Sequence, residues 1–185
     1  MEKLLSFLKQ IPEYKLLLKS VEKREAAAVT GLGQINRSHL IAGLRREFDR
    51  PVVVICQDDM TAKRIQQELA AFLGENAPVL PSRELTLYDT SVVSRAWEQK
   101  RLSQLYALSC GQTRLQILTW ESLSQRTIPP AVLRKAAFTL EVGQEYPLEE
   151  LLEKLTHAGY SRCGMVEGPG QFAIRGGILD IYSPA

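Results

Sequence analysis

The sequence predicts an α/β protein in which a parallel-sheet domain is followed by a small α+β module. The β-branched run at residues 51–56 is typical of a strand buried on both faces of a parallel sheet. Up to residue 126, strand-like segments alternate with helix-like ones, as they do in βαβ units. After Pro129-Pro130 the order changes to strand, helix and a pair of strands that two glycines separate. We therefore expect domains at residues 25–126 and 127–185.

The composition is that of an ordinary globular chain and excludes several classes of protein. Hydrophobic residues make up 45% and charged residues 24% of the 185 positions, and the net charge is +2. No basic block is long enough for a DNA-binding arm, and no apolar run approaches the roughly 18 residues that cross a bilayer. The three cysteines are widely spaced, which argues against a disulfide framework or a metal site. We expect a cytoplasmic protein that contacts no membrane.

Residues 1–24 are predicted to form N-terminal helices that pack on the following domain. An apolar stripe runs through Leu4, Leu5 and Leu8, and Pro12 is well placed to begin a second helix. Charged side chains cover the opposite face of both segments.

A phosphate-binding loop would be expected next, but the residues that it needs are altered. A buried strand is predicted at residues 26–30 and a helix at residues 37–44. Between strand and helix, a RecA-like fold that binds nucleotide carries the P-loop pattern G-x-x-x-x-G-K-[ST]. In this sequence Asn36 replaces the second glycine and Arg37 replaces the lysine.

Both replacements oppose the binding of a nucleotide. The Cβ of Asn36 obstructs the closure of backbone amides around phosphate, and the forked guanidinium of Arg37 does not reproduce a compact ammonium group. Ser38 remains as a possible magnesium ligand. We therefore predict an incomplete RecA-like domain over residues 25–126 with a degenerate P-loop at Gly31, Asn36, Arg37 and Ser38.

The remaining segments have recognisable boundaries. Asp58 and Asp59 are predicted to cap a helix over residues 61–73 that Gly74 ends, and the less favoured alternative is that both carboxylates bind a metal. The other predicted elements are a short strand at 77–80, a loop at 81–89, a helix at 93–108, a strand at 115–119, a short helix at 121–123, a strand at 137–142 and a helix at 148–158.

The helix predicted over residues 93–108 has two possible roles. Trp97 and Leu102 are expected to face inward, whereas Arg95, Lys100 and Arg101 are expected to face outward. These cations could form a nucleic-acid surface, but a solvated helix face is the simpler interpretation.

The C-terminal stretch is the one around which the chain is organised. Phe172 and Ile174 alternate with their neighbours as in a half-buried strand, and a second strand is predicted over residues 178–182. Gly176-Gly177 permits a sharp bend between them. Arg175 lies at the shoulder of this bend, where its guanidinium could meet an acidic partner or only brace the turn.

Two ordered motifs lie in this region. Residues 158–170 follow the pattern A-G-Y-x-R-x-x-x-V-x-x-x-G, and residues 170–184 follow G-x-F-x-x-R-G-x-x-x-D-I-[FY]-x-P. Together they resemble the module that bacterial transcription-repair coupling factors share with the excision-repair helicase UvrB. Residues 126–130 also match R-x-x-P-P of that family, and residues 81–89 are similar to its loop, with departures at Thr86-Leu87 and Ser91-Val92. The degenerate P-loop favours the coupling factor, because UvrB would have an intact one.

The resemblance implies that residues 127–185 form a UvrB-domain-2-like α+β module that binds the repair protein UvrA. Its predicted contact residues are Tyr160, Arg162, Phe172 and Arg175, with the aromatic side chains as anchors beside the arginines. The alternative is that both arginines are structural, with one pairing Glu167 or Asp180. Asp180 could also support the bend by accepting backbone amides.

No catalytic constellation is visible, and His39 and His157 are interpreted as structural. The resemblance implies a non-catalytic part of a longer DNA translocase. In that protein, ATP and Mg²⁺ are expected only at a downstream motor, and RNA polymerase and DNA only at downstream domains. Two alternatives stay open, which are an ATP-dependent helicase module like UvrB and a module that binds DNA directly.

Overall fold

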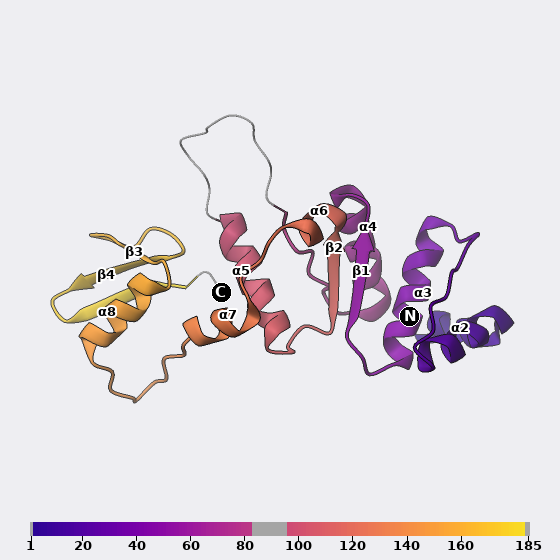
Figure 1. The fold of residues 1–185 in the computed structure, drawn as a ribbon, viewed down its shortest axis with the longest axis horizontal. Helices are drawn as coiled ribbons and strands as arrows, with labels where there is room; N and C mark the ends of the chain where they lie inside the picture. The colour runs from indigo at the N-terminus through magenta and orange to yellow at the C-terminus, as the bar shows by residue number, and fades with distance from the viewer. Residues whose placement is uncertain (1, 83–95, 184–185) are drawn as a thin grey trace. The chain divides into compact units, whose positions relative to one another are not determined.

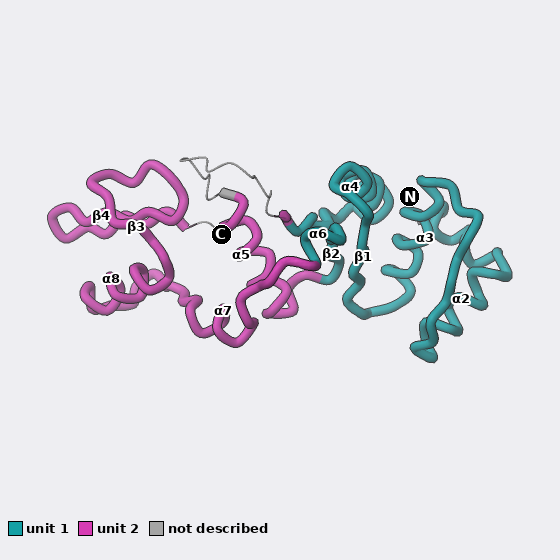
Figure 2. The backbone as a smooth tube through the Cα atoms, turned by 45° about the horizontal axis from the view of Figure 1, so that its top comes forward, with its two compact units in different colours: residues 1–80, 114–123 teal, residues 81–113, 124–185 magenta. Residues whose placement is uncertain are grey.

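The computed structural model describes residues 2–82 and 96–183, which form two compact units. The first unit contains residues 1–80 and 114–123, and the second contains residues 81–113 and 124–185, as Figure 2 shows in teal and magenta. Within the described ranges, no helix combines the length and apolarity that a membrane crossing requires. The domain limits predicted at residues 24/25 and 126/127 stay predictions.

The first unit is a mixed α/β structure (Figure 1). Its elements are α1 (Glu2–Phe7), the 3₁₀ helix η1 (Leu8–Gln10), α2 (Pro12–Glu22), α3 (Gln34–Glu47), β1 (Val52–Cys56), α4 (Asp59–Leu73), β2 (Leu115–Thr119) and the short α6 (Trp120–Ser124).

A parallel pair of strands forms the sheet of this unit. β1 and β2 run in register from Val52 opposite Leu115 to Cys56 opposite Thr119. The strand predicted at 77–80 is reduced to one parallel bridge between Val79 and Ile117. The predicted parallel sheet is thus confirmed, but it consists of a pair of strands and one further bridge.

The prediction that the first strand is buried on both faces is wrong. Val54 and Cys56 enter the core with α4, but Val53 and Ile55 are 54% and 53% exposed. The reason is that, in the described ranges, α4 covers only one face of the sheet and no further strand lies on the outer side of β1. β2 is buried along its whole length.

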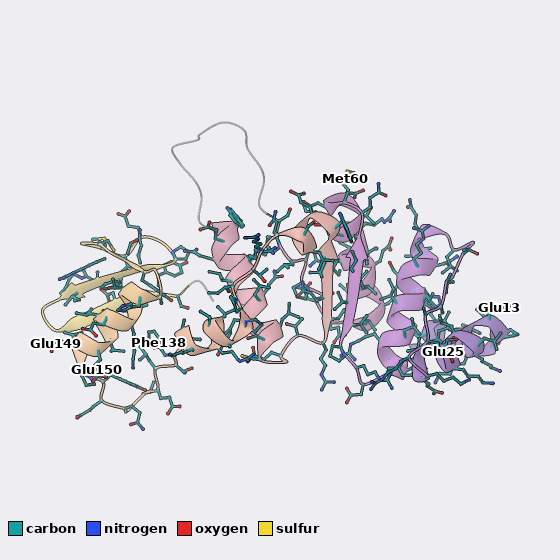
Figure 3. All side chains as sticks on the ribbon, in the orientation of Figure 1. Glu13, Glu25, Met60, Phe138, Glu149 and Glu150 are labelled. Carbon is teal, nitrogen blue, oxygen red and sulfur yellow. The ribbon has the colours of Figure 1, made fainter. Side chains whose placement is uncertain are left out.

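The limits of α4 confirm the predicted caps. The Asp58 carboxylate accepts a hydrogen bond of 2.7 Å from the Thr61 amide, and this bond lowers the pKa of Asp58. Gly74 ends the helix with a φ of +71°, which glycine adopts readily. Met60, in the first turn, lies exposed at the outside of the unit (Figure 3). Asp58 therefore acts as a cap, and the described residues contain no cluster that could hold a metal.

The second unit combines helices with a three-stranded sheet (Figure 1). Its elements are α5 (Ala96–Ser109), α7 (Pro130–Ala136), α8 (Leu148–His157), β3 (Ser161–Arg162), β4 (Gln171–Arg175) and β5 (Ile178–Tyr182). The strand order is β3-β4-β5, with β3 parallel and β5 antiparallel to β4. α8 and the last two strands were predicted, whereas α7 and β3 were not.

Two predicted strands are absent from the structure. Residues 26–30 and 137–142 form no strand, and their side chains are exposed; Phe138 lies on the connection between α7 and α8 (Figure 3). Neither segment pairs with another strand among the described residues. A segment with a β-branched or alternating sequence forms a strand only if a neighbouring strand is available. Without one, its backbone N–H and C=O groups bond to water instead.

The N-terminal helices pack on α3 at a glycine. Leu8 and Tyr14 are buried against this helix, and burial, followed by the nearby Glu47 carboxylate, raises the pKa of Tyr14 to about 12. A Cβ on Gly43 would collide with Leu8 Cδ1 and lie 2.8 Å from Tyr14 Oη. Only a residue without a side chain allows the helices to approach this closely.

Replacing Gly43 by valine is expected to detach these helices from α3. Overpacking of this kind costs about 1–3 kcal/mol, and the change should lower Tm by about 5–10 °C in a calorimetric scan. Arg37→Val, at an exposed position of the same helix, is the matched control and should have little effect. Equal melting temperatures of the two variants would contradict close packing at Gly43.

Candidate partner interface and altered phosphate loop

The glycine pair makes the predicted bend between β4 and β5. Gly176 and Gly177 have φ values of +54° and +89°, and Arg175 pairs with Ile178 on either side of them. Two successive positive φ angles are typical of the two-residue hairpin turn that matches strand twist, and glycine adopts them without strain. The predicted strand, glycine break and second strand are confirmed.

Arg175 is held beside the turn by Asp180. Arg175 Nη2 donates to Asp180 Oδ2 at 2.6 Å, and the two side chains are 59% and 36% exposed. This is a diagonal pair across the hairpin, since Asp180 lies opposite Ala173. Of the predicted alternatives, Asp180 is the partner of the arginine, and its carboxylate accepts from a guanidinium instead of from backbone amides. An exposed pair of this kind contributes about 0–1 kcal/mol, so breaking it would cost little free energy.

Arg162 lies in a different part of the sheet. It is exposed on β3, the outer strand, and stands in register with Phe172. Arg175 is three residues beyond Phe172 on β4 and so belongs to the opposite face, because side chains alternate along a strand. The structure therefore does not place the two arginines in one cluster, although both are accessible.

The two aromatic residues have different environments. Phe172 is only 2% exposed and belongs to the core of its unit, together with Leu155 of α8. The prediction that its ring anchors a partner is corrected, because a buried ring offers no surface. Tyr160 is half-buried where the chain leaves α8, and its amide donates to the Leu155 carbonyl at 3.0 Å. Tyr160 is partly exposed, two residues before Arg162, and stays a predicted contact.

Gln171 organises the loop between β3 and β4, a role that the sequence did not reveal. Its Oε1 accepts hydrogen bonds from the amides of Glu167 at 2.8 Å and Gly168 at 3.1 Å. The Gly170 amide donates to the Tyr182 carbonyl at 2.8 Å. These bonds fix the loop that follows Arg162. The signal in the sequence was a polar residue directly after the last glycine of the first motif.

The segment predicted to be an altered phosphate loop lies largely within a helix. α3 begins at Gln34, so Asn36, Arg37 and Ser38 are helical, and the Arg37 amide donates to the Gly33 carbonyl at 3.2 Å. In a phosphate loop, such amides point at the ligand. Ser38 is fully buried, and its hydroxyl donates to Glu68 at 2.5 Å. These observations do not fit a nucleotide at this loop.

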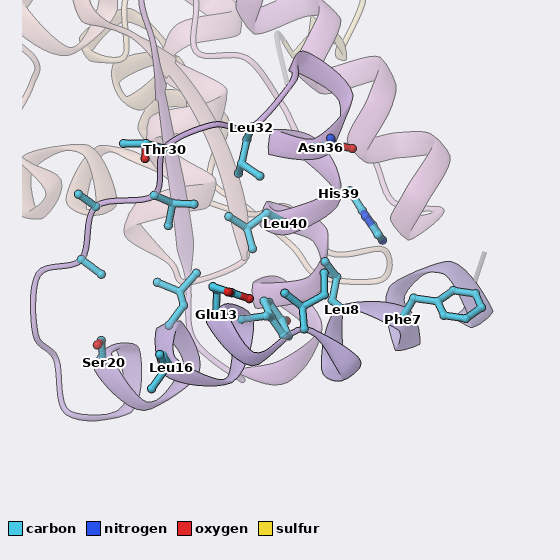
Figure 4. Close-up of a pocket in the computed structure, with 16 residues that line it drawn as sticks. Phe7, Leu8, Glu13, Leu16, Ser20, Thr30, Leu32, Asn36, His39 and Leu40 are labelled. Carbon is cyan, nitrogen blue, oxygen red and sulfur yellow. The ribbon is translucent and has the colours of Figure 1, made fainter.

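The space next to this loop is an apolar cavity of about 610 Å³ (Figure 4). It lies between α2, α3 and residues 27–32, and its wall includes Leu16, Leu32 and Leu40. None of the described residues that line it is a lysine or arginine, while Glu13 contributes a carboxylate. A triphosphate carries several negative charges, and this lining offers no cation to balance them.

The cationic face predicted on the helix over 93–108 is not present as expected. Arg101 is buried and donates from Nη1 to the Pro81 carbonyl at 2.6 Å, and burial lowers its pKa. Leu102 is exposed instead. Arg95 and most of the loop at 81–89 lie outside the described residues. Lys100 is exposed, so only part of the predicted surface is available to DNA.

The histidines have structural contacts. The His39 ring stacks on Phe72 with centroids 5.1 Å apart, and its Nε2 lies 2.9 Å from the Leu4 carbonyl oxygen. His157 Nδ1 lies 2.8 Å from the Glu153 carbonyl in the last turn of α8. Both interpretations as structural residues are supported by these contacts.

The second unit contains a segment that matches a known protein domain. Residues 138–185 match the UvrB interaction domain family. Over 184 residues the chain is 26% identical to the transcription-repair-coupling factor of Bacillus subtilis, which covers 98% of this chain and 16% of the relative. The corresponding proteins of Myxococcus xanthus and Escherichia coli are 32% and 30% identical over 163 and 169 residues, covering 83% and 91% of this chain and 14% of each relative.

The chain is homologous to transcription-repair-coupling factors. It spans about one sixth of the length of the Bacillus subtilis coupling factor. The match to the UvrB interaction domain begins after α7 and contains α8 and all three strands of the second unit. Arg162 and Arg175 both lie within it.

Proposed function

We propose that this chain is a non-catalytic, UvrB-like part of a transcription-repair-coupling factor and that its second unit binds UvrA. The observation that carries the proposal is the position of two exposed arginines inside the match to the UvrB interaction domain. We also propose that the first unit is an incomplete RecA-like domain, which its parallel strands and flanking α3 and α4 support. In the whole protein, an ATP-dependent motor, RNA polymerase and DNA would act through other domains.

The arrangement of the arginines favours a partner that reaches around the outer strand. Arg162 lies on β3, and Arg175 lies on the opposite face at the end of β4. A UvrA surface that contacts both must therefore pass the outer edge or the hairpin end of the sheet. Ordering each exposed arginine side chain on binding costs about 0.5–1.5 kcal/mol, but the two charges should speed association at low salt.

The helicase alternative is disfavoured by the first unit. An ATP-dependent module would need loop amides and a cation around the phosphates, whereas the Arg37 amide is bonded inside α3 and the neighbouring cavity is apolar. The DNA-binding alternative is weakened by the burial of Arg101.

Titration of the chain with UvrA, Mg·ATP and duplex DNA tests these alternatives. We expect saturable binding of UvrA and no binding of Mg·ATP or duplex DNA. Arg175→Ala should raise the Kd for UvrA about 10-fold, because it removes a charge that a partner's carboxylate can bind. Surface plasmon resonance at two salt concentrations would measure this change.

Arg37→Ala is the matched control, since it removes the same charge from an exposed position in the first unit. Its Kd for UvrA should equal that of the wild type. A chain that binds Mg·ATP or duplex DNA but not UvrA would refute the proposed function.

A further inference from the structure

We infer that Glu68 holds the Ser38 hydroxyl of the altered loop and joins α3 to α4, so that this hydroxyl is not available to the metal ion of a nucleotide. The inference rests on the proposed interpretation of residues 31–38 as a former phosphate loop. It adds a residue, 30 positions beyond Ser38, that the loop sequence itself does not contain.

The contact between Ser38 and Glu68 is short and partly buried. Ser38 Oγ donates to Glu68 Oε2 at 2.5 Å, the serine has no exposed surface, and the glutamate side chain is 17% exposed. Hydrogen bonds from a hydroxyl to a carboxylate are short and about twice as strong as neutral ones. Because Ser38 is fully buried, water competes weakly for its hydroxyl.

The carboxylate has a cation from its own helix. Arg64 lies one turn earlier on α4, and its Nε is 3.8 Å from Glu68 Oε1. One oxygen of Glu68 therefore faces a guanidinium while the other receives the serine proton. This pairing partly balances the charge of the half-buried carboxylate.

The same geometry opposes nucleotide at this point. In an intact loop, the serine hydroxyl binds the magnesium ion of the nucleotide. Here the hydroxyl points at a carboxylate between two packed helices, and Ser38 is absent from the lining of the neighbouring cavity. A triphosphate placed here would meet the negative charge of Glu68 at close range.

A double-mutant cycle tests the inference in the whole chain. Ser38→Ala and Glu68→Ala should each lower Tm by about 3–10 °C, because each leaves a buried polar partner without its bond. The double variant should lose clearly less than the sum of the two single losses, since only one interaction is removed. Glu75→Ala, which removes a more exposed carboxylate, is the control and should change Tm by about 1–2 °C at most.

Milder changes keep the test decisive if an alanine variant does not fold. Glu68→Gln keeps an acceptor for Ser38 but removes the charge, and it should fall between the wild type and Glu68→Ala. Strictly additive losses in the cycle, or a Glu68→Gln variant as stable as the wild type, would overturn the inference.

The effect of Mg·ATP on Tm provides an independent test. A ligand that binds the folded state raises Tm, so millimolar Mg·ATP should leave the wild-type Tm unchanged. A clear rise in the wild type that Ser38→Ala abolishes would show that Ser38 binds Mg·ATP and would also overturn the inference. UvrA binding by Glu68→Gln should equal that of the wild type. If no variant or wild type binds UvrA while the cycle still shows coupling, the proposed function fails and this inference stands.

Discussion

Replacing Phe172 by alanine is expected to unfold the three-stranded sheet of the second unit. The ring is 2% exposed and lies on the central strand, β4, between two strands that pair with it. Removal of a buried phenylalanine side chain costs about 3–5 kcal/mol, which is a large part of the stability of a small domain. Hydrogen exchange of the β4 and β5 amides, together with a thermal scan, would measure the loss.

Ile178→Ala is the control in the same sheet. Ile178 is an exposed residue of β5 next to the turn, so its truncation should cost little. A Phe172→Ala variant with the same Tm as the wild type would contradict this expectation, and its binding to UvrA should then be measured. A loss of binding under that condition would restore the earlier prediction that the ring contacts the partner.

Reversing the charge at Arg162 is expected to have the largest effect on UvrA binding. Arg162→Glu should raise the Kd about 100-fold, equivalent to about 2.7 kcal/mol. The substitution removes an attractive charge and places a like charge against an acidic partner surface, which costs several kcal/mol in known interfaces. Because the side chain is exposed on an outer strand, Tm should stay within about 2 °C of the wild type.

Lys135→Glu provides the matched charge reversal. Lys135 is exposed on α7, in the same unit and before the region that matches the UvrB interaction domain. Lys135→Glu should weaken UvrA binding only slightly and mainly at low salt.

Combining Arg162→Glu with Arg175→Ala should give additive losses of binding free energy, since the two side chains occupy opposite faces. A shared, non-additive loss would mean that both contact one small patch.

The sequence predicted the elements whose signals are local. Asp58 and Gly74 define the limits of α4 because a cap and a left-handed turn depend on a few neighbouring residues. The hairpin around Gly176-Gly177 was predictable for the same reason. The candidate site in this hairpin region stays a prediction, and the burial of Phe172 on the central strand depends on neighbouring elements and could not be predicted from β4 alone.

The failures concern long-range pairing and helix phase. Residues 26–30 have a strand-like composition but no neighbouring strand in the described ranges. The inward face of α5 is formed by positions with the spacing of one helix face, which are Trp97, Arg101, Leu105 and Leu108. Leu102 is hydrophobic but lies off this helix face, and it is exposed. Glu68 was missed because its partner Ser38 is on another helix.

The open side of β1 has a consequence for the behaviour of this chain in concentrated solution. The run from Val52 to Cys56 carries no charged residue, and Val53 and Ile55 face outward. Natural edge strands are commonly guarded by lysine, proline or a bulge, which keep them from adding to a neighbouring molecule. Among the described residues, β1 lacks such gatekeepers within the strand, so we expect the chain to be prone to self-association along this edge at high concentration.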